Sequence, residues 1–513
     1  MDLKKQDKEK ESNSLEADLD YSLARKLPIS FAKKYKIVPL RMNNGFVEVA
    51  AVQDLFYCRI IDDLRAFFRR EIKPLYINNE EFVTLIASVY YEEREAASGI
   101  LEDIKKDEHS LDIEVEGVKD LLEASDEGPV IAFVNSILSE ALEKRASDIH
   151  IEPFEKDVRI RYRVDGILYD SLRLPRSLHP QVSSRIKVMA GLNLAEKRLP
   201  QDGRIRVKIG GKDIDIRVSV LPTVFGERVV LRLLNREDID LNLKELGFEK
   251  GDLEMFSSLI HKDHGLILTT GPTGAGKTTT LYASLSTINS PEKNILTIED
   301  PIEYQLKGIG QMQVTPNIGL TFSKGLRHIL RQDPDVLMVG EIRDRETAEI
   351  AIHASLTGHL VFSTLHTNNS VGAIARLIDM GIEPFLVSAS LLAVLAQRLV
   401  RTLCPHCKEP YQKNLDYIKD DIFVFADSKG QTIYKKRGCE RCFQTGYYGR
   451  AGLYELLVMT DPIRKMILDR ADNATIGKEA QIKGLSTLRK GGLKKVLGGV
   501  TTEEEVARVT QEE

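Results

Sequence analysis

The 513-residue sequence contains no tryptophan, few aromatic residues (6%) and only five cysteines. It also lacks a long hydrophobic run. The longest apolar stretch, residues 385–396, is well short of the about 20 residues with which a helix crosses a bilayer, and we expect a buried helix there. Neither sign of charge is in clear excess, because 72 basic residues face 77 acidic ones and the pI is near 6.2. Overall charge therefore gives no reason to expect nucleic acid as a partner.

The first twenty residues are charged and contain no apolar segment, so they do not resemble a secretory signal or a membrane anchor. We expect residues 1–20 to form a disordered tail, because they have little to bury. Together with the missing hydrophobic span, this indicates a cytoplasmic protein that reaches a membrane only through partners.

With 42% hydrophobic and 29% charged residues, the chain has the composition of a globular protein of about three domains. Periodicity and local composition predict its organisation. In chain order we expect the tail at 1–20, a small N-terminal domain at 21–98, a charged linker at 99–128, a second domain at 129–240, an α/β domain at 241–403 and 453–513, and a cysteine-bearing insert at 404–452.

A phosphate-binding loop is the strongest local signal. A short apolar strand at 264–270 runs into GPTGAGKT, and a helix opens directly after it, which is the context that the pattern GxxxxGK[ST] requires. Backbone N–H groups and the helix N-terminus favour phosphate oxygens, Lys277 can reach the β- and γ-phosphates of ATP, and Thr278 can place its hydroxyl on Mg²⁺. The predicted nucleotide-binding residues of this loop are Gly271, Pro272, Thr273, Gly274, Ala275, Gly276, Lys277, Thr278 and Thr279. A chance glycine-rich turn is the alternative, and the order strand, loop, helix argues against it.

Hydrolysis also requires a group that orients or deprotonates water. The apolar strand at 336–341 ends in Glu341, which we predict to be that group. The aspartate that often precedes such a glutamate is replaced by Gly340, so another acid or a water must complete the ligand shell of Mg²⁺. A surface acid at a strand end is the alternative interpretation of Glu341.

Two further apolar strands carry candidate residues at their ends. Glu299 follows the apolar residues 295–298 and should emerge at the same sheet edge as the phosphate loop. His359 and His366 flank one strand. A single histidine there would more often be structural, whereas two leave a sensor of the γ-phosphate open as a hypothesis.

Two predicted strands, at 158–164 and 214–220, alternate apolar and polar residues, and a third at 229–233 carries Arg232. This period of two puts valine and isoleucine on one face and mostly arginine, aspartate or serine on the other. Solvation is the ordinary explanation of such a face. Arginines on several strands, among them Arg217 and Arg232, also leave a polyanion contact open.

Four of the five cysteines form two CxxC pairs, Cys404 with Cys407 and Cys439 with Cys442, separated by 31 residues. In a chain without a secretion signal this pattern favours a metal site over disulfides. Four thiolates can hold one Zn²⁺ at about 2.3 Å, and His406 is a poorer candidate because it lies in a tight turn between two ligands. A Cys₄ site has no position for a catalytic water, so the zinc should be structural. Free buried thiols and a redox pair are the alternatives.

The strings GPTGAGKTTTLYA, TIEDPIEY, LRQDPDVLMVGEIRDRETA and TGHLVFSTLHTN occur in this order. They resemble the Walker A, aspartate-box, Walker B and histidine-box motifs of the type II/type IV secretion ATPase superfamily. The resemblance extends upstream to ASDIHIEP, RYRVDG and AEKRLPQDGRI and downstream to QRLVRTLCPHC, so it covers about residues 130–510. Within the superfamily the chain is most similar to the type II secretion ATPases.

The resemblance implies a RecA-like P-loop ATPase domain of α/β class with a Cys₄ zinc insert, preceded by a PAS-like α+β domain and a small N-terminal α+β domain. It also implies a homo-hexamer in which the nucleotide lies between the ATPase domain and the domain before it. Arg217 and Arg232 match family arginines that reach the phosphates from that preceding domain. Further family arginines near the nucleotide match Arg327, Arg331 and Arg343, and a glycine is usual at position 340.

In the superfamily, the first domain docks on the cytoplasmic domain of an L-type inner-membrane component, and the motor acts through an F-type platform protein. The resemblance therefore implies a peripheral place on the cytoplasmic face of the inner membrane. The leading hypothesis is an ATPase that drives pseudopilus assembly and protein export, and the runner-up is a type IV pilus assembly or DNA-uptake motor. The cysteine insert argues against retraction motors only. A nucleic-acid translocase, disfavoured by the acidic pI, and a non-catalytic nucleotide-binding scaffold are the remaining alternatives.

Overall fold

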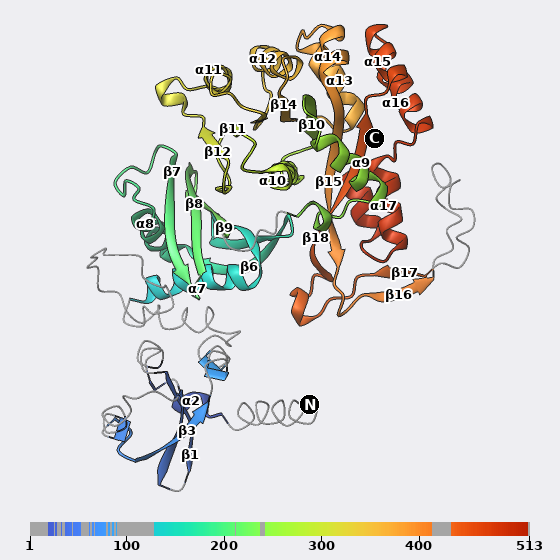
Figure 1. Cartoon of the computed structure of the whole chain (residues 1–513). Coiled ribbons are helices and arrows are strands. Elements are labelled where there is room, and N and C mark those ends of the chain that lie inside the picture. Colours follow the sequence, from blue (N-terminus) through green and yellow to red (C-terminus); the bar gives the residue numbers. More distant parts are fainter. Residues whose placement is uncertain are drawn as a thin grey trace. The chain divides into compact units, whose positions relative to one another are not determined.

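A computed structural model (Figure 1) describes residues 19–89 with gaps, 128–235 except 211, 242–412 and 432–510. The gaps in the first range are residues 25, 28–31, 33–35, 44, 53–60, 62–63, 66, 78–80, 83–84 and 87–88. The chain divides into two compact units, residues 1–237 and 238–513, and each is described by itself. Most of the predicted tail and linker lies outside the described residues, and the finer domain boundaries stay predictions. No helix among the described residues is long and apolar enough to cross a membrane.

The first unit begins with a small α+β part. Its elements are α2 (Tyr21–Ala24), β1 (Ile37–Asn43), β2 (Phe46–Val52) and β3 (Glu71–Ile77). β2 lies in the middle of the sheet, antiparallel to β1 and parallel to β3. Apolar side chains of all three strands share one core with described helical residues such as Leu64.

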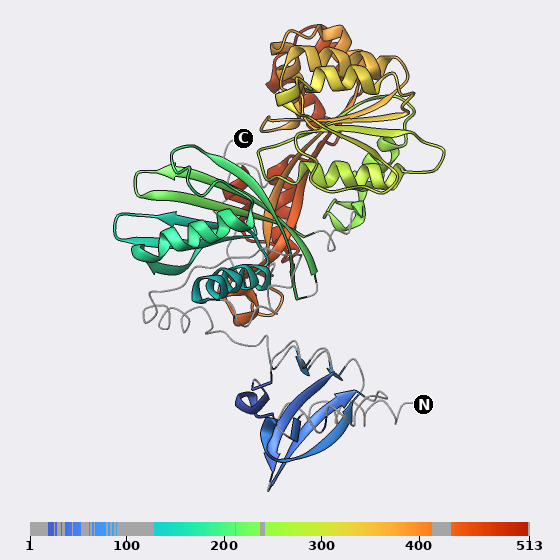
Figure 2. The same cartoon turned by 90° about the vertical axis from the view of Figure 1, so that its left-hand side faces the viewer.

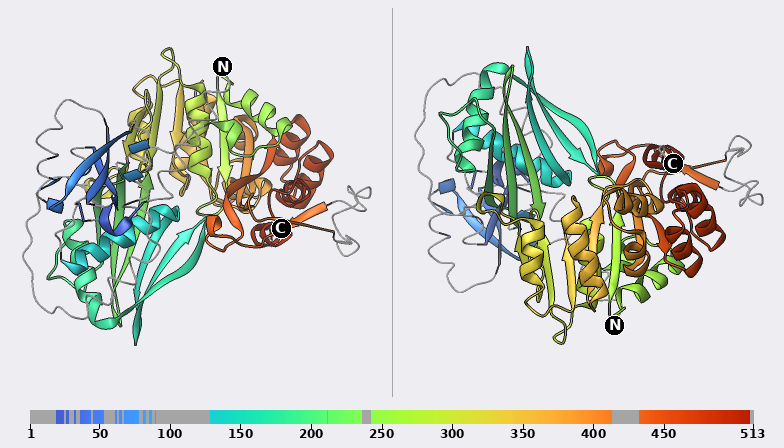
Figure 3. Two further views of the ribbon diagram at one scale, coloured as in Figure 1. Left: turned by 90° about the horizontal axis from the view of Figure 1, so that it is seen from below. Right: turned by 90° about the horizontal axis from the view of Figure 1, so that it is seen from above.

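The second part of this unit is an antiparallel sheet in the order β6-β5-β4-β9-β8-β7. Its strands are among the teal to green arrows in Figure 3. Its elements are α7 (Pro129–Glu143), β4 (Ala146–Pro153), β5 (Asp157–Val164), β6 (Ile167–Pro175), η1 (Arg176–Leu178), α8 (His179–Met189), β7 (Gln201–Ile209), β8 (Lys212–Thr223) and β9 (Gly226–Asn235). Along β5 every second residue is buried, as the alternation predicts. The buried residues pack with α7 and α8 in one core, so the charged residues occupy the other face.

The second unit is built on a seven-stranded sheet in the order β12-β11-β13-β14-β10-β15-β18. Its strands are β10 (Gly265–Thr270), β11 (Ile295–Glu299), β12 (Gly310–Gln313), β13 (Val336–Val339), β14 (Leu360–Leu365), β15 (Leu391–Leu403) and β18 (Tyr447–Val458). All neighbours are parallel except β15 and β18, which are antiparallel. The strands predicted at 264–270, 295–298 and 336–341 are β10, β11 and β13, which confirms these elements.

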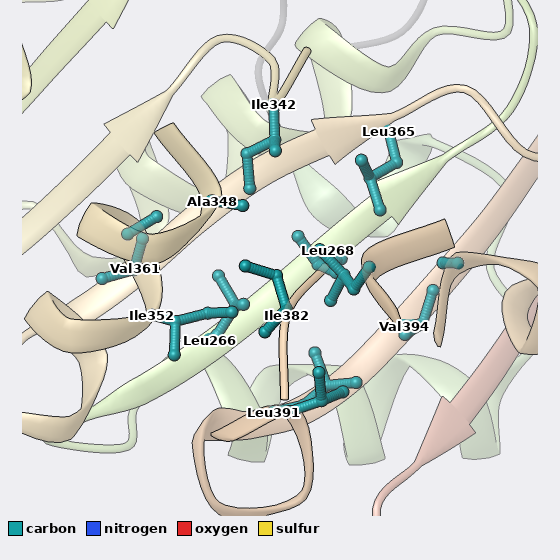
Figure 4. Packing of buried hydrophobic residues seen from close by; sticks show 14 of the residues in the cluster. Leu266, Leu268, Ile342, Ala348, Ile352, Val361, Leu365, Ile382, Leu391 and Val394 are labelled. Carbon is teal, nitrogen blue, oxygen red and sulfur yellow. The ribbon is translucent and has the colours of Figure 1, made fainter. Parts of the chain in front are cut away.

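Helices cover both faces of this sheet (Figure 2). They are α9 (Lys250–Ile260), α10 (Lys277–Ile288), α11 (Phe322–Ile329), α12 (Arg345–Leu356), α13 (Ser370–Asp379), α14 (Pro384–Ser390), α15 (Asp461–Leu468), α16 (Asn473–Ile482), α17 (Leu488–Leu497) and α18 (Glu503–Thr510), with the short turns η2 (Leu243–Glu245), η3 (Pro316–Ile318) and η5 (Glu440–Cys442). Figure 4 shows the core on one face, where Leu266 and Leu268 of β10 meet Ile352 of α12 and Val394 of β15. Alternate residues of β10, such as Ile267, face α9 and α10 instead. With both faces covered, the central strands are apolar throughout, as parallel sheets usually are.

The apolar stretch at 385–396 is not a single buried helix, so this prediction was wrong. α14 ends at Ser390, and the chain continues as β15, whose residues 393–398 are all buried. A strand that is buried on both faces has no alternation, and its apolar run cannot be told from a helix by periodicity.

β15 and β18 pair from Ala393–Val458 to Leu403–Tyr447, and the cysteine insert connects them. Within the insert, β16 (Glu409–Gln412) and β17 (Thr432–Lys435) form a second antiparallel pair, and residues 413–431 lie outside the described part. After β18 the described chain is helical, from α15 to α18.

Candidate active site and metal centre

The predicted phosphate loop connects β10 to α10. Gly274 and Gly276 have left-handed backbones, with φ of 79° and 85°, which turn the chain back on itself before the helix begins at Lys277. A Cβ atom on Gly271 would lie 2.5 Å from the carbonyl oxygen of Gln397 in β15. Only glycine fits this approach, so packing fixes the start of the loop and backbone conformation fixes its turns.

Lys277 is buried against the loop. Its Nζ donates hydrogen bonds to the carbonyl oxygens of Gly271 (2.5 Å) and Pro272 (3.2 Å). Burial lowers the pKa of Lys277 to about 8, the charge of Glu341 works against this shift, and Arg398 adds to it. A buried lysine cation beside the backbone of a glycine-rich loop is suited to bind phosphate oxygens.

His366, Glu341 and Arg343 lie next to this lysine. Nδ1 of His366 is 3.4 Å from Nζ of Lys277, and its Nε2 is 3.5 Å from Oε2 of Glu341. Lysine can only donate, so Nδ1 accepts and the ring proton is on Nε2, facing the carboxylate. Burial and the charge of Lys277 lower the pKa of His366, which favours the neutral ring. Arg343 pairs with Glu341 and is 3.9 Å from Asp300.

Gly340 is pressed against the neighbouring strand β11. Its N–H donates to the carbonyl oxygen of Ile298 (2.8 Å), and its own carbonyl accepts from Oγ1 of Thr364 (2.7 Å). A Cβ atom at this position would meet the Ile298 oxygen at 3.3 Å and the Cα of Glu299 at 3.4 Å. An aspartate here would crowd β11, which gives a packing reason for the missing acid.

Glu299 is not brought to the phosphate loop. It is buried at the end of β11, where its carboxylate accepts hydrogen bonds from the hydroxyls of Tyr282 and Thr297 and from Nε2 of Gln311. Tyr282 belongs to α10, so the side chain of Glu299 points to the α10 face of the sheet. The position of Glu299 at a strand end was predicted correctly. The sequence did not show to which face of the sheet its side chain points. A catalytic role of Glu299 stays a prediction.

His359 is also not brought to the loop. It precedes β14, whereas His366 follows it, and β14 runs parallel to β10. The two histidines therefore lie at opposite ends of β14. At a rise of about 3.3 Å per residue, these ends are about 20 Å apart. His359 contacts the carbonyl oxygen of Ala354 through Nδ1 at 2.9 Å, near the end of α12. In its own chain it is remote from the phosphate loop, and only His366 lies at it.

The remaining predicted arginines are placed as follows. Arg327 of α11 pairs with Glu346 at 2.7 Å, and Arg331 follows α11 at an exposed position. Arg217 and Arg232 belong to the first unit, where they are direct neighbours on β8 and β9, and Nε of Arg232 donates to Asp148 at 3.0 Å. Their nucleotide-binding roles stay predictions.

Two contacts beside the loop were not foreseen. Asp300 follows Glu299 and lies 3.9 Å from Arg343. The strand-end position that identified Glu299 could also have identified Asp300. Thr270, the last residue of β10, has its Oγ1 2.7 Å from Oγ1 of Thr367 and accepts the N–H of that residue at 2.8 Å. This pair fixes the segment after His366 to the start of the phosphate loop, and no sequence motif announces it.

The four predicted zinc ligands lie together. Their sulfur atoms are all within 4.8 Å of one another, at 3.9 Å for Cys404–Cys439, 3.8 Å for Cys407–Cys442 and 3.7 Å for Cys439–Cys442. Zn–S bonds of about 2.3 Å in a tetrahedron separate sulfur atoms by about 3.8 Å, so the cluster fits Zn²⁺. His406 instead contacts Arg441, with 3.0 Å between Nε2 and Nη1.

Backbone groups around Cys442 favour a thiolate. Burial alone would raise the pKa of this thiol, but the N–H groups of Cys439 and Gly446, each 3.2 Å from the sulfur, outweigh it and lower the pKa to about 7. A thiolate is the form that binds a metal ion.

A mostly parallel sheet, a strand–loop–helix phosphate site at β10 and a glutamate just after β13, two strands away in the sheet, define a P-loop ATPase. Residues 123–508 match the family model of type II/IV secretion system proteins, and residues 14–96 match the MshEN domain. The chain belongs to the type II/IV secretion system protein family, as predicted, and is a secretion ATPase.

Individual relatives show which members of the family the chain is similar to. The chain is 49% identical to type II secretion system protein E of Pseudomonas aeruginosa over 95% of its own length and 97% of the relative's. It is 48% identical to type II secretion system ATPase E of Vibrio cholerae, with the same coverage, and 44% identical to the type IV pilus assembly ATPase PilB of Myxococcus xanthus over 96% of this chain and 88% of that one.

Solved structures support the fold. The pilus retraction motor PilT with bound ADP has a TM-score of 0.50 at 28% identity, covering 73% of this chain and 96% of that one. The ATPase DotB of Legionella pneumophila, at 22% identity, has a TM-score of 0.55 over 74% of this chain and 96% of its own.

Proposed function

We propose that this chain hydrolyses ATP to drive pseudopilus assembly and protein export by a type II secretion system. The arrangement of Lys277, His366 and Glu341 around the phosphate loop is the observation that carries the chemistry. The near-full-length similarity to proteins named type II secretion system protein E carries the choice of machine.

In the proposed mechanism, the phosphates of ATP take the place that the carbonyl oxygens of Gly271 and Pro272 now hold on Nζ of Lys277. Backbone N–H groups of the loop and the N-terminus of α10 bind the phosphate oxygens. Thr278 would hold Mg²⁺, which neutralises phosphate charge. Glu341 orients and deprotonates the attacking water. Its carboxylate is close enough to the phosphates for this role, because only the ring of His366 lies between it and Lys277.

The neutral ring of His366 is placed to sense the γ-phosphate, because its Nδ1 lies 3.4 Å from Nζ of Lys277, the group that the phosphate would bind. Arg343 holds Glu341 and would be drawn to the phosphates when nucleotide enters. We further propose that Arg217 and Arg232 of the first unit, with Arg327 and Arg331, complete the nucleotide site in a homo-hexamer.

The proposed partners are an L-type inner-membrane component, bound by the N-terminal domain, and an F-type platform protein. They would hold the motor at the cytoplasmic face of the inner membrane. No role for nucleic acid is proposed. The four cysteines would hold a structural Zn²⁺, because a filled Cys₄ shell leaves no position for a substrate water.

A type IV pilus assembly or DNA-uptake motor is the second candidate, favoured by the 44% identity to a pilus assembly ATPase. Affinity capture of the tagged chain from membranes of its native cells, followed by mass spectrometry, separates the two. Recovery of type II secretion inner-membrane components supports the first proposal. Recovery of pilus platform components in their place contradicts it.

A further inference from the structure

Behind the phosphate loop, β15 carries a buried arginine for which the mechanism above has no role. Arg398 is 7% exposed. Its guanidinium donates from Nη2 to the carbonyl oxygen of Asn368 (2.8 Å), from Nη1 to that of Gln397 (3.2 Å) and from Nε to that of Val509 (3.2 Å). Asn368 lies two residues after His366, and Val509 is in the last turn of α18. One side chain therefore binds two segments that are far apart in the sequence.

The same region of β15 supports the phosphate loop at both of its ends. A Cβ atom on Gly271 would meet the Gln397 carbonyl at 2.5 Å and Nη1 of Arg398 at 3.2 Å, so the first loop residue packs on both. Oε1 of Gln397 accepts a hydrogen bond from Oγ1 of Thr280, in the first turn of α10, at 2.9 Å. The position of this strand consequently sets the geometry of the loop.

The third contact connects the loop to the cysteine insert. The carboxyl end of a helix carries partial negative charge, which favours a cation such as Arg398 at Val509. The segment that leads into α18 contacts the insert and the start of β18. Nζ of Lys408 in the insert donates to the carbonyl oxygen of Gly499 at 2.9 Å, and the hydroxyls of Tyr447, the first residue of β18, and Thr502 are 2.9 Å apart. Residues 499–510 therefore lie between the insert and Arg398.

We infer that Arg398 is a positioning residue for ATP hydrolysis, which fixes the phosphate loop relative to His366 and to the carboxyl end of α18. The planar guanidinium is suited to this task because its N–H groups point in fixed directions, whereas lysine would supply only a point charge. This inference rests on the proposed function of the phosphate loop.

The alternative is that Arg398 only stabilises the fold, and Arg401 provides a matched control. It lies on the same strand and binds the same helix, with Nη2 2.6 Å from Oε1 of Glu505. Its guanidinium also stacks over the ring of Tyr447, 4.0 Å from the centroid. Glu505 is in the first turn of α18, so replacing Arg401 should disturb the start of that helix without changing the contacts of Arg398 with Val509 or the support of Gly271.

The experiment compares full-length R398K, R398Q and R401Q with the unsubstituted chain, measuring kcat and KM for ATP together with Tm. Misplaced catalytic groups lower kcat, so we expect both Arg398 variants to lose about 10-fold or more in kcat while KM changes by less than about 3-fold. R401Q should lower Tm at least as much as R398Q and keep kcat within about 2-fold of the native value. R398K with native kcat would overturn the inference, since charge alone would then suffice. So would an equal loss of kcat in R401Q.

A K277A variant in the same assay separates the inference from the function on which it rests. If K277A hydrolyses ATP like the native chain, the proposed role of the loop fails and the inference fails with it. If K277A is inactive while both Arg398 variants match the native chain, only the inference about Arg398 fails.

Discussion

Glu341 has one neighbour on each side, the ring of His366 and the guanidinium of Arg343. This arrangement orients the carboxylate while the side chain remains 17% exposed to an approaching substrate. A glutamate that only closed a strand end would not need a histidine between itself and the phosphate-loop lysine.

Replacing Glu341 by glutamine should abolish turnover and keep nucleotide binding. Glutamine preserves the shape of the side chain but cannot accept the proton of water, and loss of a general base lowers kcat by about 10²–10⁴-fold. ATP affinity, measured with a fluorescent analogue, should stay within about 3-fold of the native value because Lys277 and the loop are unchanged.

The control for this prediction is Glu349→Gln. Glu349 is on α12 and pairs with the exposed Arg345 at 2.7 Å, outside the phosphate site. This variant should hydrolyse ATP at the native rate. Native turnover in E341Q would support a nucleotide-binding scaffold over a motor.

Sequence could predict which residues sit at strand ends but not every direction they face. His359 and His366 carried the same signal, and only the parallel direction of β14 and β10 separates them. Glu299 was correctly placed at the end of β11, yet the pleat turns its carboxylate to Tyr282. Contacts such as Thr270–Thr367 join residues 97 positions apart, and no local pattern encodes them.

At the scale of elements, motifs defined by local spacing were predicted well. Whether a buried apolar run forms a helix or a strand was predicted poorly. The CxxC pairs and the phosphate loop depend on residues close in sequence, so their patterns were sufficient. The stretch at 385–396 changes from α14 to β15 within an unbroken apolar run, because the strand is covered on both faces. Composition alone contains no information about that change.

The cysteine insert should lose its metal when one ligand is removed. We expect one Zn²⁺ per native chain and little or none in C442S, measured by inductively coupled plasma mass spectrometry after dialysis. Metal binding contributes directly to folding, and a loss of about 2 kcal/mol would lower Tm by about 4–8 °C.

Cys58 is the matched control, since it lies outside both CxxC pairs. C58S should keep its zinc. A native chain without zinc after purification in zinc-supplemented medium would contradict the assignment, as would a C442S variant that binds a full equivalent.

α18 is attached to β15 by an ion pair whose strength should depend on pH. Burial would raise the pKa of Glu505, but hydrogen bonds from Arg401 and Arg508 outweigh it and lower the pKa from its usual 4.5 to about 2. Because the folded pKa is the lower one, the carboxylate stabilises the fold above about pH 4.5 and ceases to do so as the pH falls towards 2.

Glu505→Gln should therefore reduce the free energy of unfolding by about 1–3 kcal/mol near neutral pH. The difference from the native chain should shrink below pH 4.5, as followed by urea denaturation at several pH values. Glu504→Gln is the control: it removes an exposed pair with Lys436 and should change stability by less than about 1 kcal/mol. A pH-independent difference for E505Q would contradict the prediction.

At the scale of the whole molecule, the phosphate loop belongs to one unit of the chain and the predicted arginines Arg217 and Arg232 to the other. Each is a direct neighbour of the other in the sheet, on the face opposite the core of α7 and α8. On this face Arg232 already pairs with Asp148 at 3.0 Å. If, as proposed, arginines of the first unit complete the nucleotide site, ATP hydrolysis should depend on them.

Arg232→Gln should lower kcat by at least about 100-fold, since an arginine that reaches the transferred phosphate from a second domain contributes at least that much. Binding of nucleotide to the loop should persist, because Lys277 is untouched. Arg173→Gln is the matched control: Arg173 lies on β6 of the same sheet and pairs with Asp157 and Asp170 at 3.8 and 3.9 Å. Both variants should have native thermal stability within a few degrees, so that rate reports on chemistry. If R232Q and R173Q hydrolyse ATP equally well in the assembled state, the arginines of the first unit do not reach the phosphates, and the ATPase unit must complete its own site.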